Sequence, residues 1–422
     1  MSAEPNPTLQ IEHIAELSRA VGEHEALRAL REEARSLLDP LVLPNRARHL
    51  WKYTNPARFL PASDPTAPVP VAVPEQWRLD DPAAAAALVA AGQIRLVHLS
   101  EEARRAGVVV EDLHRGGAAD LLGTAVPPTH GVVEAINAAA WRGGVLVRVP
   151  RGVTLEEPIR LRLLAGPGGA VAVPRVLVVA EPGSSFEVLE GHTAGETGSL
   201  VLGVSEIFVG EDASVRHALI QRWEAGVTGH LTARARVAAN GRFQLAVASF
   251  GGSLYKADVG VVLAGEGAEA ETFGVAMGGD RQHMDHHTEH IHLAGRTRSN
   301  LDVRVALTDA ARSAYTGMIR IAAGARECEA YQENRNLLLS KEARAESIPE
   351  LEILNQDVRC SHGATVAPLD PEQLFYLASR GLPHNHALRL IVFGFLDQTL
   401  ARLPESSRQR LEALVAARLH TE

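Results

Sequence analysis

Turn signals return at a nearly constant interval through the middle of this sequence. After Gly144, short runs rich in Val, Ile and Leu alternate with turn residues, without an intervening helical pattern. Gly183, Asp212, Gly241 and Gly267 mark turns at intervals of 29, 29 and 26 residues. One coil of a solenoid has this span, whereas a β-sandwich has less regular spacing and more two-residue hairpins. The pattern predicts a right-handed parallel β-helix, a mainly β fold flanked by N-terminal and C-terminal α-helical regions.

The later part of the chain repeats at half this interval. Arg312, Arg326, Arg344 and Arg359 begin similar triplets at separations of 14, 18 and 15 residues, which fits two strand–turn units per coil. Hydrophobic residues make up 46% of the sequence, but aromatic residues only 4%. The hydrophobic residues are therefore mostly small or branched aliphatic ones. Such side chains suit the interior of a stack in which each coil packs on the next.

Residue composition and the spacing of apolar residues divide the sequence into four regions. We expect a helical region at 1–60, a Pro-rich linker with a mixed α/β lead-in at 61–142, the β-helix at 143–368, and a C-terminal helical region at 369–422. Within the lead-in, the Ala-rich segment 82–91 is predicted to be a helix. Amphipathic spacing in the last region predicts three helices that cap the solenoid.

Charge and motif content exclude several classes of partner. The chain has 42 Lys and Arg against 51 Asp and Glu, a formal net charge of −9, and no dense basic block. We therefore expect no nucleic acid partner. We find neither a leader segment nor an apolar run of about 18 residues, so we expect a soluble, cytoplasmic protein that does not contact membranes. Gly251-Gly252 and Gly278-Gly279 lack the context of a phosphate-binding loop, so no nucleotide site is predicted.

Histidines are concentrated between His283 and His292. Alternate residues of a strand share a face, so His286, His290 and His292 should point one way. Asp285, His287 and Glu289 should point the other way. Three imidazoles on one face are a potential zinc or iron site. The alternative is that they line a strand edge or stack as polar ladders. The segment lacks the HExxH spacing of a helical zinc site, which favours this alternative.

Cys328 and Cys360 are the two cysteines of the sequence. Two thiols are too few for a disulfide framework or a Cys-rich zinc site within one chain. Cys360 and His362 would share one face of a strand, where a thiolate and an imidazole can reach the same metal, sulfide or persulfide. The alternatives are a buried structural cysteine with a hydrogen-bonded histidine, or a Cys–His nucleophile, for which no adjacent oxyanion loop is seen.

Several segments, taken together, carry a family resemblance that no single motif would carry. The segments are Pro349–Ile353, Cys360–Thr365, Leu374–Gly381, Asp285–Thr288, Asn336–Ser340 and Gly394–Phe395. They resemble the signature of the SufB/SufD family of iron–sulfur cluster assembly proteins over about residues 140 to 400. Trp51–Thr54 looks like the N-terminal motif of the SufD branch, and the length is also more similar to SufD than to SufB.

This resemblance implies a non-catalytic scaffold subunit built on a parallel β-helix. It implies pairing with a SufB-type paralogue and binding of a SufC-type ABC ATPase through the C-terminal helices, and it allows a homodimer in isolation. His362, with Cys360 beside it, would hold iron or a transient iron–sulfur cluster at the interface with SufB. Cys328 is assigned to core packing.

Two other functions compete with this interpretation. A β-helix enzyme acting on acidic polysaccharide would fit the solenoid alone, but such enzymes are usually secreted and carry carboxylates or arginines along a groove. A metal-dependent hydrolase would use the histidines between His283 and His292 as ligands. The motif that contains Cys360 and His362 argues against the first of these functions, and analysis for bound metal would test the second.

Overall fold

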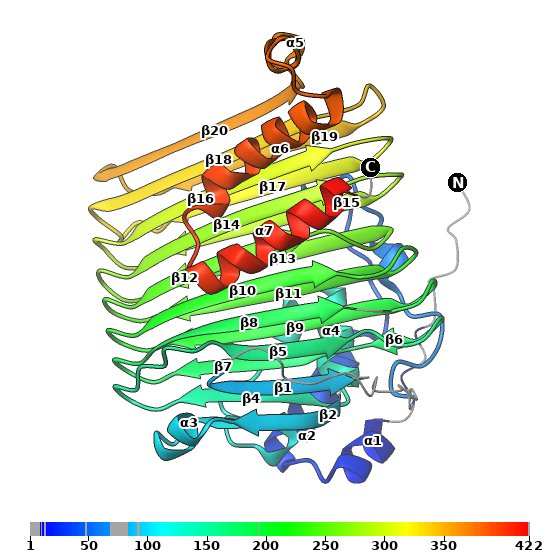
Figure 1. The fold of residues 1–422 in the computed structure, drawn as a ribbon. Helices are drawn as coiled ribbons and strands as arrows, with labels where there is room; N and C mark the ends of the chain where they lie inside the picture. Colours follow the sequence, from blue (N-terminus) through cyan, green and yellow to red (C-terminus); the bar gives the residue numbers. More distant parts are fainter. Residues whose placement is uncertain are drawn as a thin grey trace.

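Successive strands of the chain alternate between two facing sheets, so that the backbone winds as a parallel β-helix (Figure 1). The computed structural model describes residues 9, 11, 14–46, 49–67, 83–90, 93–193 and 195–420. The predicted fold class is therefore confirmed as a mainly β solenoid with helices near both ends of the chain.

The two sheets are called sheet A and sheet B. Sheet A contains, in spatial order, β2 (Gln93–Leu99), β1 (Ala85–Ala90), β5 (Ile159–Leu164), β8 (Ser185–Thr193), β10 (Ser214–Arg222), β12 (Arg242–Ser249), β14 (Glu269–Gly278), β16 (Arg298–Leu307), β18 (Cys328–Leu338) and β20 (Val358–Pro368). Sheet B contains β19 (Arg344–Ile353), β17 (Arg312–Ile321), β15 (His283–His292), β13 (Leu254–Leu263), β11 (Thr228–Val237), β9 (Leu200–Val209), β7 (Arg175–Ala180), β4 (Gly144–Val149) and β3 (Val109–Asp112), with β6 (Val171–Ala172) paired to β9.

Equivalent residues of successive coils lie side by side in continuous rows. Val215 pairs with Phe243 and Phe243 with Ala270, and the same row reaches Cys360 in β20. Because side chains alternate between the two faces of a strand, each row lies entirely inside or entirely outside the solenoid. The inward rows of the lower and middle coils form the largest apolar cluster, which is dominated by Val, Ala and Leu.

In most coils, one corner is built from a residue in the left-handed backbone region. The φ angles are 72° at Gly183, 56° at Asp212, 53° at Asn240 and 70° at Gly267. The amide of each of these residues donates a hydrogen bond of 2.8 to 3.2 Å to a carbonyl of the next coil. Gly, Asp and Asn tolerate this conformation best. The corner explains why turn residues recur in the sequence at the interval of one coil.

The N-terminal helices cover the outer face of sheet B. They comprise α1 (Ile14–Val21), α2 (Glu25–Leu37) and α4 (Val132–Ala140), with the short 3-10 turns η1 (His49–Trp51), η2 (Pro56–Phe59), η3 (Leu113–Arg115) and η4 (Pro128–His130). Trp51 and Phe59 pack against His230 of β11, with ring centroids 5.8 and 5.4 Å from its imidazole. The Thr54 hydroxyl contacts both His283 and Asp285 of β15. The Trp51–Thr54 motif therefore fastens the N-terminal region to this sheet.

The helix predicted for residues 82–91 is wrong, because Ala85–Ala90 form strand β1. This strand pairs antiparallel with β2 and parallel with β5, so it extends sheet A. All six residues are buried. Alanine favours an isolated helix, but pairing on both edges and burial of both faces outweigh a preference of less than about 1 kcal/mol per residue. Residues 68–82, which include the second half of the predicted Pro-rich stretch at 61–74, lie outside the described residues.

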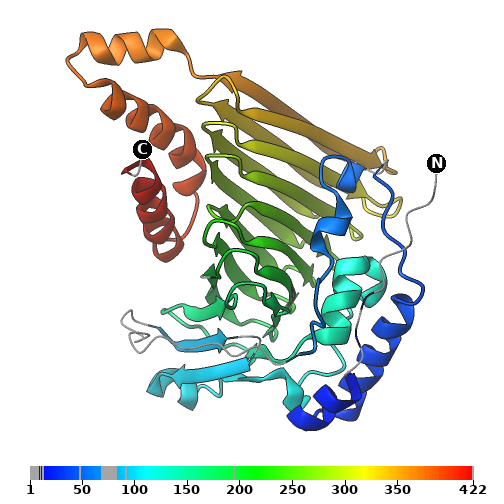
Figure 2. The ribbon, with the colours of Figure 1, turned by 90° about the vertical axis from the view of Figure 1, so that its right-hand side faces the viewer.

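The C-terminal helices do not cap the solenoid, contrary to the sequence prediction. Helices α6 (His384–Leu400) and α7 (Glu405–His420) lie along the outer face of sheet A, while α5 (Pro371–Ser379) projects beyond the last strands (Figures 1 and 2). Val392, Leu396 and Val415 pack there on outward apolar residues of sheet A, including Phe273. An apolar outer face needs a cover, which explains this position.

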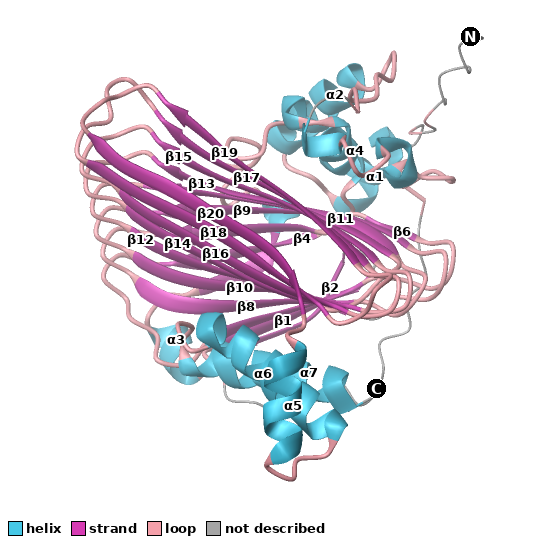
Figure 3. Cartoon of the chain, turned by 90° about the horizontal axis from the view of Figure 1, so that it is seen from above, coloured by secondary structure: helices cyan, strands magenta, loops and turns pink. Residues whose placement is uncertain are grey.

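Viewed along the stack, the two helical regions lie on opposite sides of the solenoid (Figure 3). The short helix α3 (Glu101–Arg105) follows β2.

No helix in the described part of the chain is both long and apolar enough to cross a membrane.

The left-handed corner can be tested at Asp212, which is exposed. Asp212→Val should lower the free energy of unfolding by about 1–2 kcal/mol, because a β-branched residue resists positive φ. Asp212→Gly is the matched control and should leave the stability equal or slightly higher. Urea denaturation of both variants measures the difference, and equal stability of the two would contradict the role of the corner.

Candidate functional site

Among the described residues, the solenoid ends at strands that have no further strand beyond them. In the described part of the chain, β20 pairs only with β18 and β19 only with β17. One edge of each of these strands therefore presents unpaired backbone N–H and C=O groups. At the opposite end, β2 and β3 run antiparallel to their neighbours. We call the β19–β20 end the open end.

Cys360 and His362, the two residues predicted as ligands, lie together at the open end. Cys360 pairs with Ala330 and His362 with Gln332, and both of these partners are buried residues of inward rows. The two predicted residues therefore share the inward face of the last strand, as expected for residues two apart. Cys360 is half-buried against an apolar cluster, whereas His362 is exposed. Metal binding by these two residues stays a prediction.

The thiol of Cys360 is not activated within the isolated chain. Burial raises its pKa to about 11, from an ordinary value near 9. The thiolate is the form that binds metals. A nearby cation or a bound metal would have to stabilise the negative charge before this residue could act as a ligand. This requirement argues equally against a Cys–His nucleophile that works in the chain alone.

Buried amide side chains line the interior directly beneath the open end. Gln332, Asn334 and Asn336 occupy the inward face of β18 and are almost fully buried. The Asn336 Nδ2 atom donates to Asn334 Oδ1 at 2.7 Å and to the Thr365 carbonyl at 3.1 Å, which ties β20 to the coil below. The interior is therefore polar beneath His362, whereas Cys360 lies against an apolar cluster.

Cys328 lies in the coil below and is fully buried. Its Sγ atom is 3.1 Å from the Thr297 hydroxyl, and it packs with Leu301 and Ile319. Both cysteines are free thiols. These contacts are those expected for the predicted packing role.

The inward histidines of β15 have separate hydroxyl partners rather than a common centre. His286 Nε2 is 2.8 Å from Ser249 Oγ, and His290 Nε2 is 2.9 Å from Thr272 Oγ1. His292 lies between two further hydroxyls. Burial lowers the pKa values of these three histidines to about 4, 3 and 4, so they are neutral at neutral pH. The arrangement is the polar ladder that was the alternative to a metal site.

A carboxylate deep inside the solenoid was not predicted. Glu190 accepts hydrogen bonds from His192 at 2.7 Å, His217 at 2.9 Å and Ser205 at 2.8 Å. Burial alone would raise the pKa of Glu190, but the bonds to the two imidazoles outweigh it and hold the pKa well below the usual range. The cluster contains two histidines that the sequence analysis had not singled out.

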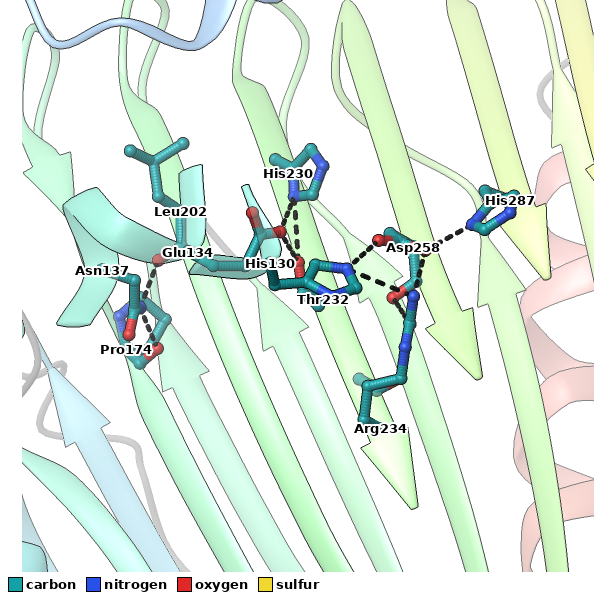
Figure 4. A network of polar contacts seen from close by, with 11 residues as sticks. His130, Glu134, Asn137, Pro174, Leu202, His230, Thr232, Arg234, Asp258 and His287 are labelled. Atoms are coloured by element: carbon teal, nitrogen blue, oxygen red, sulfur yellow. Dashed lines mark hydrogen bonds and ion pairs between the residues drawn. The ribbon is translucent and has the colours of Figure 1, made fainter. Parts of the chain in front are cut away.

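A second unpredicted network lies on the outer face of sheet B, beneath α4 (Figure 4). Asp258 of β13 is its centre. The Asp258 Oδ1 atom accepts from Arg234 at 2.7 Å and lies 2.5 Å from His287 Nδ1, and Oδ2 lies 2.8 Å from His130 Nε2. Burial opposes ionisation of Asp258, but Arg234 and His287 outweigh it and hold its pKa well below the usual range.

The network continues into α4. Glu134 accepts a hydrogen bond from the Thr232 hydroxyl, and Asn137 donates to the carbonyls of Pro174 and Leu202 at 3.0 and 2.8 Å. The sequence offers one signal for this site, the spacing of four between His130 and Glu134 at the start of a helix. No short-range sequence pattern connects these residues with Asp258, which is 128 residues away from His130.

A shallow groove of about 770 Å³ runs along the outer face of sheet A near β20. Charges alternate along its row of exposed residues, from Glu269 through Arg298 and Glu329 to Arg359. Ion pairs of 3.6 to 3.7 Å join Glu329 to both neighbouring arginines. The carboxylates of this groove are therefore largely neutralised by their neighbours.

Comparisons with known proteins place the core of the chain in a single family. Residues 163–395, more than half of the chain, match the family described as SUF system FeS cluster assembly, SufBD core domain. Proteins named as iron–sulfur cluster assembly SufBD family proteins from Staphylococcus saprophyticus, Staphylococcus epidermidis and Staphylococcus haemolyticus are each 31% identical over 69% of the chain. The aligned region spans 63% of the length of each relative.

The state of the Cys360 thiol can be measured by alkylation of the isolated chain. In a Cys328→Ala background, iodoacetamide should react slowly at neutral pH, and the rate should keep rising to a pH of about 11, because burial keeps the thiol protonated. Cys360→Ser in the same background is the control and should not react. A rate that levels off near about pH 8.5, the value for a free cysteine, would show that the thiol is not desolvated.

Proposed function

We propose that this chain, which belongs to the SufBD family of iron–sulfur cluster assembly proteins, is a SufD-type scaffold subunit that presents His362 to a nascent cluster. The observation that carries the proposal is the placement of His362 and Cys360 on one inward face of the open end. Both groups lie where a second subunit can reach them. The cluster, or the iron from which it forms, is the cargo of this site rather than a resident cofactor.

The open end suits a partner that is itself a β-helix. Its last strands present unpaired backbone groups, and several large apolar side chains beside them are exposed, among them Leu354 at 59% and Val366 at 45%. Unpaired edges with exposed apolar residues are places where another chain adds. A SufB-type paralogue would continue the stack there. A second copy of this chain would use the same surface when the paralogue is absent.

The donor set fits a shared and transient site. Imidazole and thiolate are ligands that iron and iron–sulfur clusters accept. One imidazole and one thiol leave most positions around an iron ion open, so ligands from a partner would complete the site. Because the pKa of Cys360 is raised by burial, the thiolate would form only when metal or a partner's cation is present. Such a site can also release its cargo when the interface loosens.

Helix α5 is the surface that we assign to an ABC ATPase of the SufC type. It has no buried residue, and it exposes Phe375 at 76% and Tyr376 at 57%. Leu390 of the neighbouring helix is 55% exposed. The sequence contains no phosphate-binding loop, so ATP would be bound by the partner. ATP-driven changes in that partner would then shift the two scaffold subunits between arrangements.

The scaffold is proposed to be non-catalytic and to act in the cytoplasm. A half-exposed free thiol such as Cys360 is best preserved in a reducing compartment. Of the competing functions, a polysaccharide-active enzyme would need free carboxylates in its groove, but those on sheet A are paired with arginines. A hydrolase built on the β15 histidines would need them to converge, and their hydrogen bonds hold them apart.

The role of His362 can be tested by complementation of cells that depend on this assembly pathway. His362→Ala should cost no more than about 1 kcal/mol of stability, because the side chain is exposed. It should still assemble with the SufB-type and SufC-type subunits, yet fail to support cluster formation. Cys328→Ala is the control for a packing cysteine and should complement. Full complementation by a folded His362→Ala chain would remove the basis of the proposal.

The ATPase surface can be tested by substitution rather than truncation. Deleting the C-terminal helices would uncover the apolar outer face of sheet A, so the loss of binding would be uninterpretable. Phe375→Ser together with Tyr376→Ser should weaken ATPase binding in a pull-down by at least about tenfold. The free energy of unfolding of this double variant should stay within about 0.5 kcal/mol of the wild-type value. Leu293→Ser, exposed at 46% after β15, is the matched control. Undiminished binding by the double variant would place the ATPase elsewhere.

A further inference from the structure

We infer that His130, Glu134 and Asp258 form a binding site for a divalent metal ion on the outer face of sheet B, independent of the open end. One ligand atom from each residue lies within 4.8 Å of the other two. The two carboxylates are buried, at 4% and 2% exposure, whereas the His130 side chain is 25% exposed. An ion could therefore enter from the side of His130 and meet two carboxylates already placed.

The three residues are held in place by elements on both sides of the site (Figure 4). His130 ends the η4 turn and Glu134 lies in the first turn of α4, with the extended backbone of Gly131 between them. Asp258 points outward from β13, towards these two residues. Between the helical residues, Gly131 leaves room for the Glu134 carboxylate, because a Cβ atom there would lie 2.5 Å from Glu134 Oε2.

Each carboxylate has an outer partner that fixes its orientation. Arg234 and His287 occupy Asp258 Oδ1 and leave Oδ2 directed towards His130. The Thr232 hydroxyl holds Glu134 on its sheet side. Metal-binding carboxylates and imidazoles in proteins characteristically have such hydrogen-bonded outer partners. A purely structural ion pair would need only Arg234 and Asp258.

The charge and donor chemistry select the kind of ion. Glu134 and Asp258 offer two carboxylates against the one permanent positive charge of Arg234. Burial would lower the pKa of His130, but the hydrogen bond to Asp258 outweighs it and raises this pKa, so an ion would have to displace a proton from this imidazole to bind it. One imidazole nitrogen with two carboxylate oxygens suits zinc, iron(II) or cobalt(II) rather than a soft monovalent ion. Arg234 stays close to the ion, which lowers the affinity relative to a site without a cation. The ion would clamp α4 onto β13.

The test uses the full chain with the open end disabled by Cys360→Ser and His362→Ala. After removal of metals by a chelator, cobalt(II) should bind with one equivalent and give a visible d–d spectrum, and zinc should displace it. His130→Ala or Glu134→Gln added to this background should weaken cobalt binding by at least about tenfold. His386→Ala, an exposed histidine on α6, is the matched control and should change nothing.

A measurement of melting temperature distinguishes the loss of the metal site from a failure of the variant to fold. Zinc should raise the melting temperature of the background chain but not that of its His130→Ala derivative, because only the folded site binds the ion. His130 is partly exposed, so this derivative is expected to fold. Absence of cobalt binding to the background chain, or binding that is unchanged in a folded His130→Ala derivative, would overturn the inference and leave the network as a docking contact for α4.

Discussion

Each coil of a β-helix can form strand hydrogen bonds only with the coil before it and the coil after it. The described coils therefore repeat the same alternation of inward and outward residues, and most of them repeat the same corner. The repetition makes the middle of the solenoid self-sufficient and makes its two ends different in kind. One end is terminated by antiparallel strands, and the other leaves a strand that carries Cys360 and His362. The candidate site exists because, in the described part of the chain, no further strand is stacked on β20.

The features that were predictable from sequence are those that recur at short range. The corner residues gave the coil interval, and the period of two placed Cys360 and His362 on one face. The strand β1 was missed because its alanine-rich sequence favours a helix locally, and only its neighbours β2 and β5 reveal the strand. The network around Asp258 was missed because it joins elements far apart in the sequence. Long-range contacts of that kind depend on which coil lies under which helix, information that no single segment carries.

Neighbouring residues of strand β15 show how strongly the two faces of one strand differ. His286 is sealed in the interior, where burial lowers its pKa and a serine hydroxyl is its partner. His287, the next residue, points outward to the carboxylate of Asp258. The sequence presents these histidines as a single cluster, but the fold distributes them between an inner ladder and an outer network. Counting histidines within a segment is therefore a weak guide to metal sites in β-helices, whereas assigning them to faces first is a better one.

The difference between the two ends also limits how many chains can join. Among the described strands, β2 runs antiparallel to its neighbour, so a strand added beyond it would not continue the parallel winding, whereas the β19–β20 edge can take another parallel coil. A building block with one such edge has a valence of one. Two blocks that meet edge to edge use up both edges and close the assembly, whereas a block with two edges would grow into a fibre. The shape of the chain thus permits a large exposed strand edge without the risk of open-ended polymerisation.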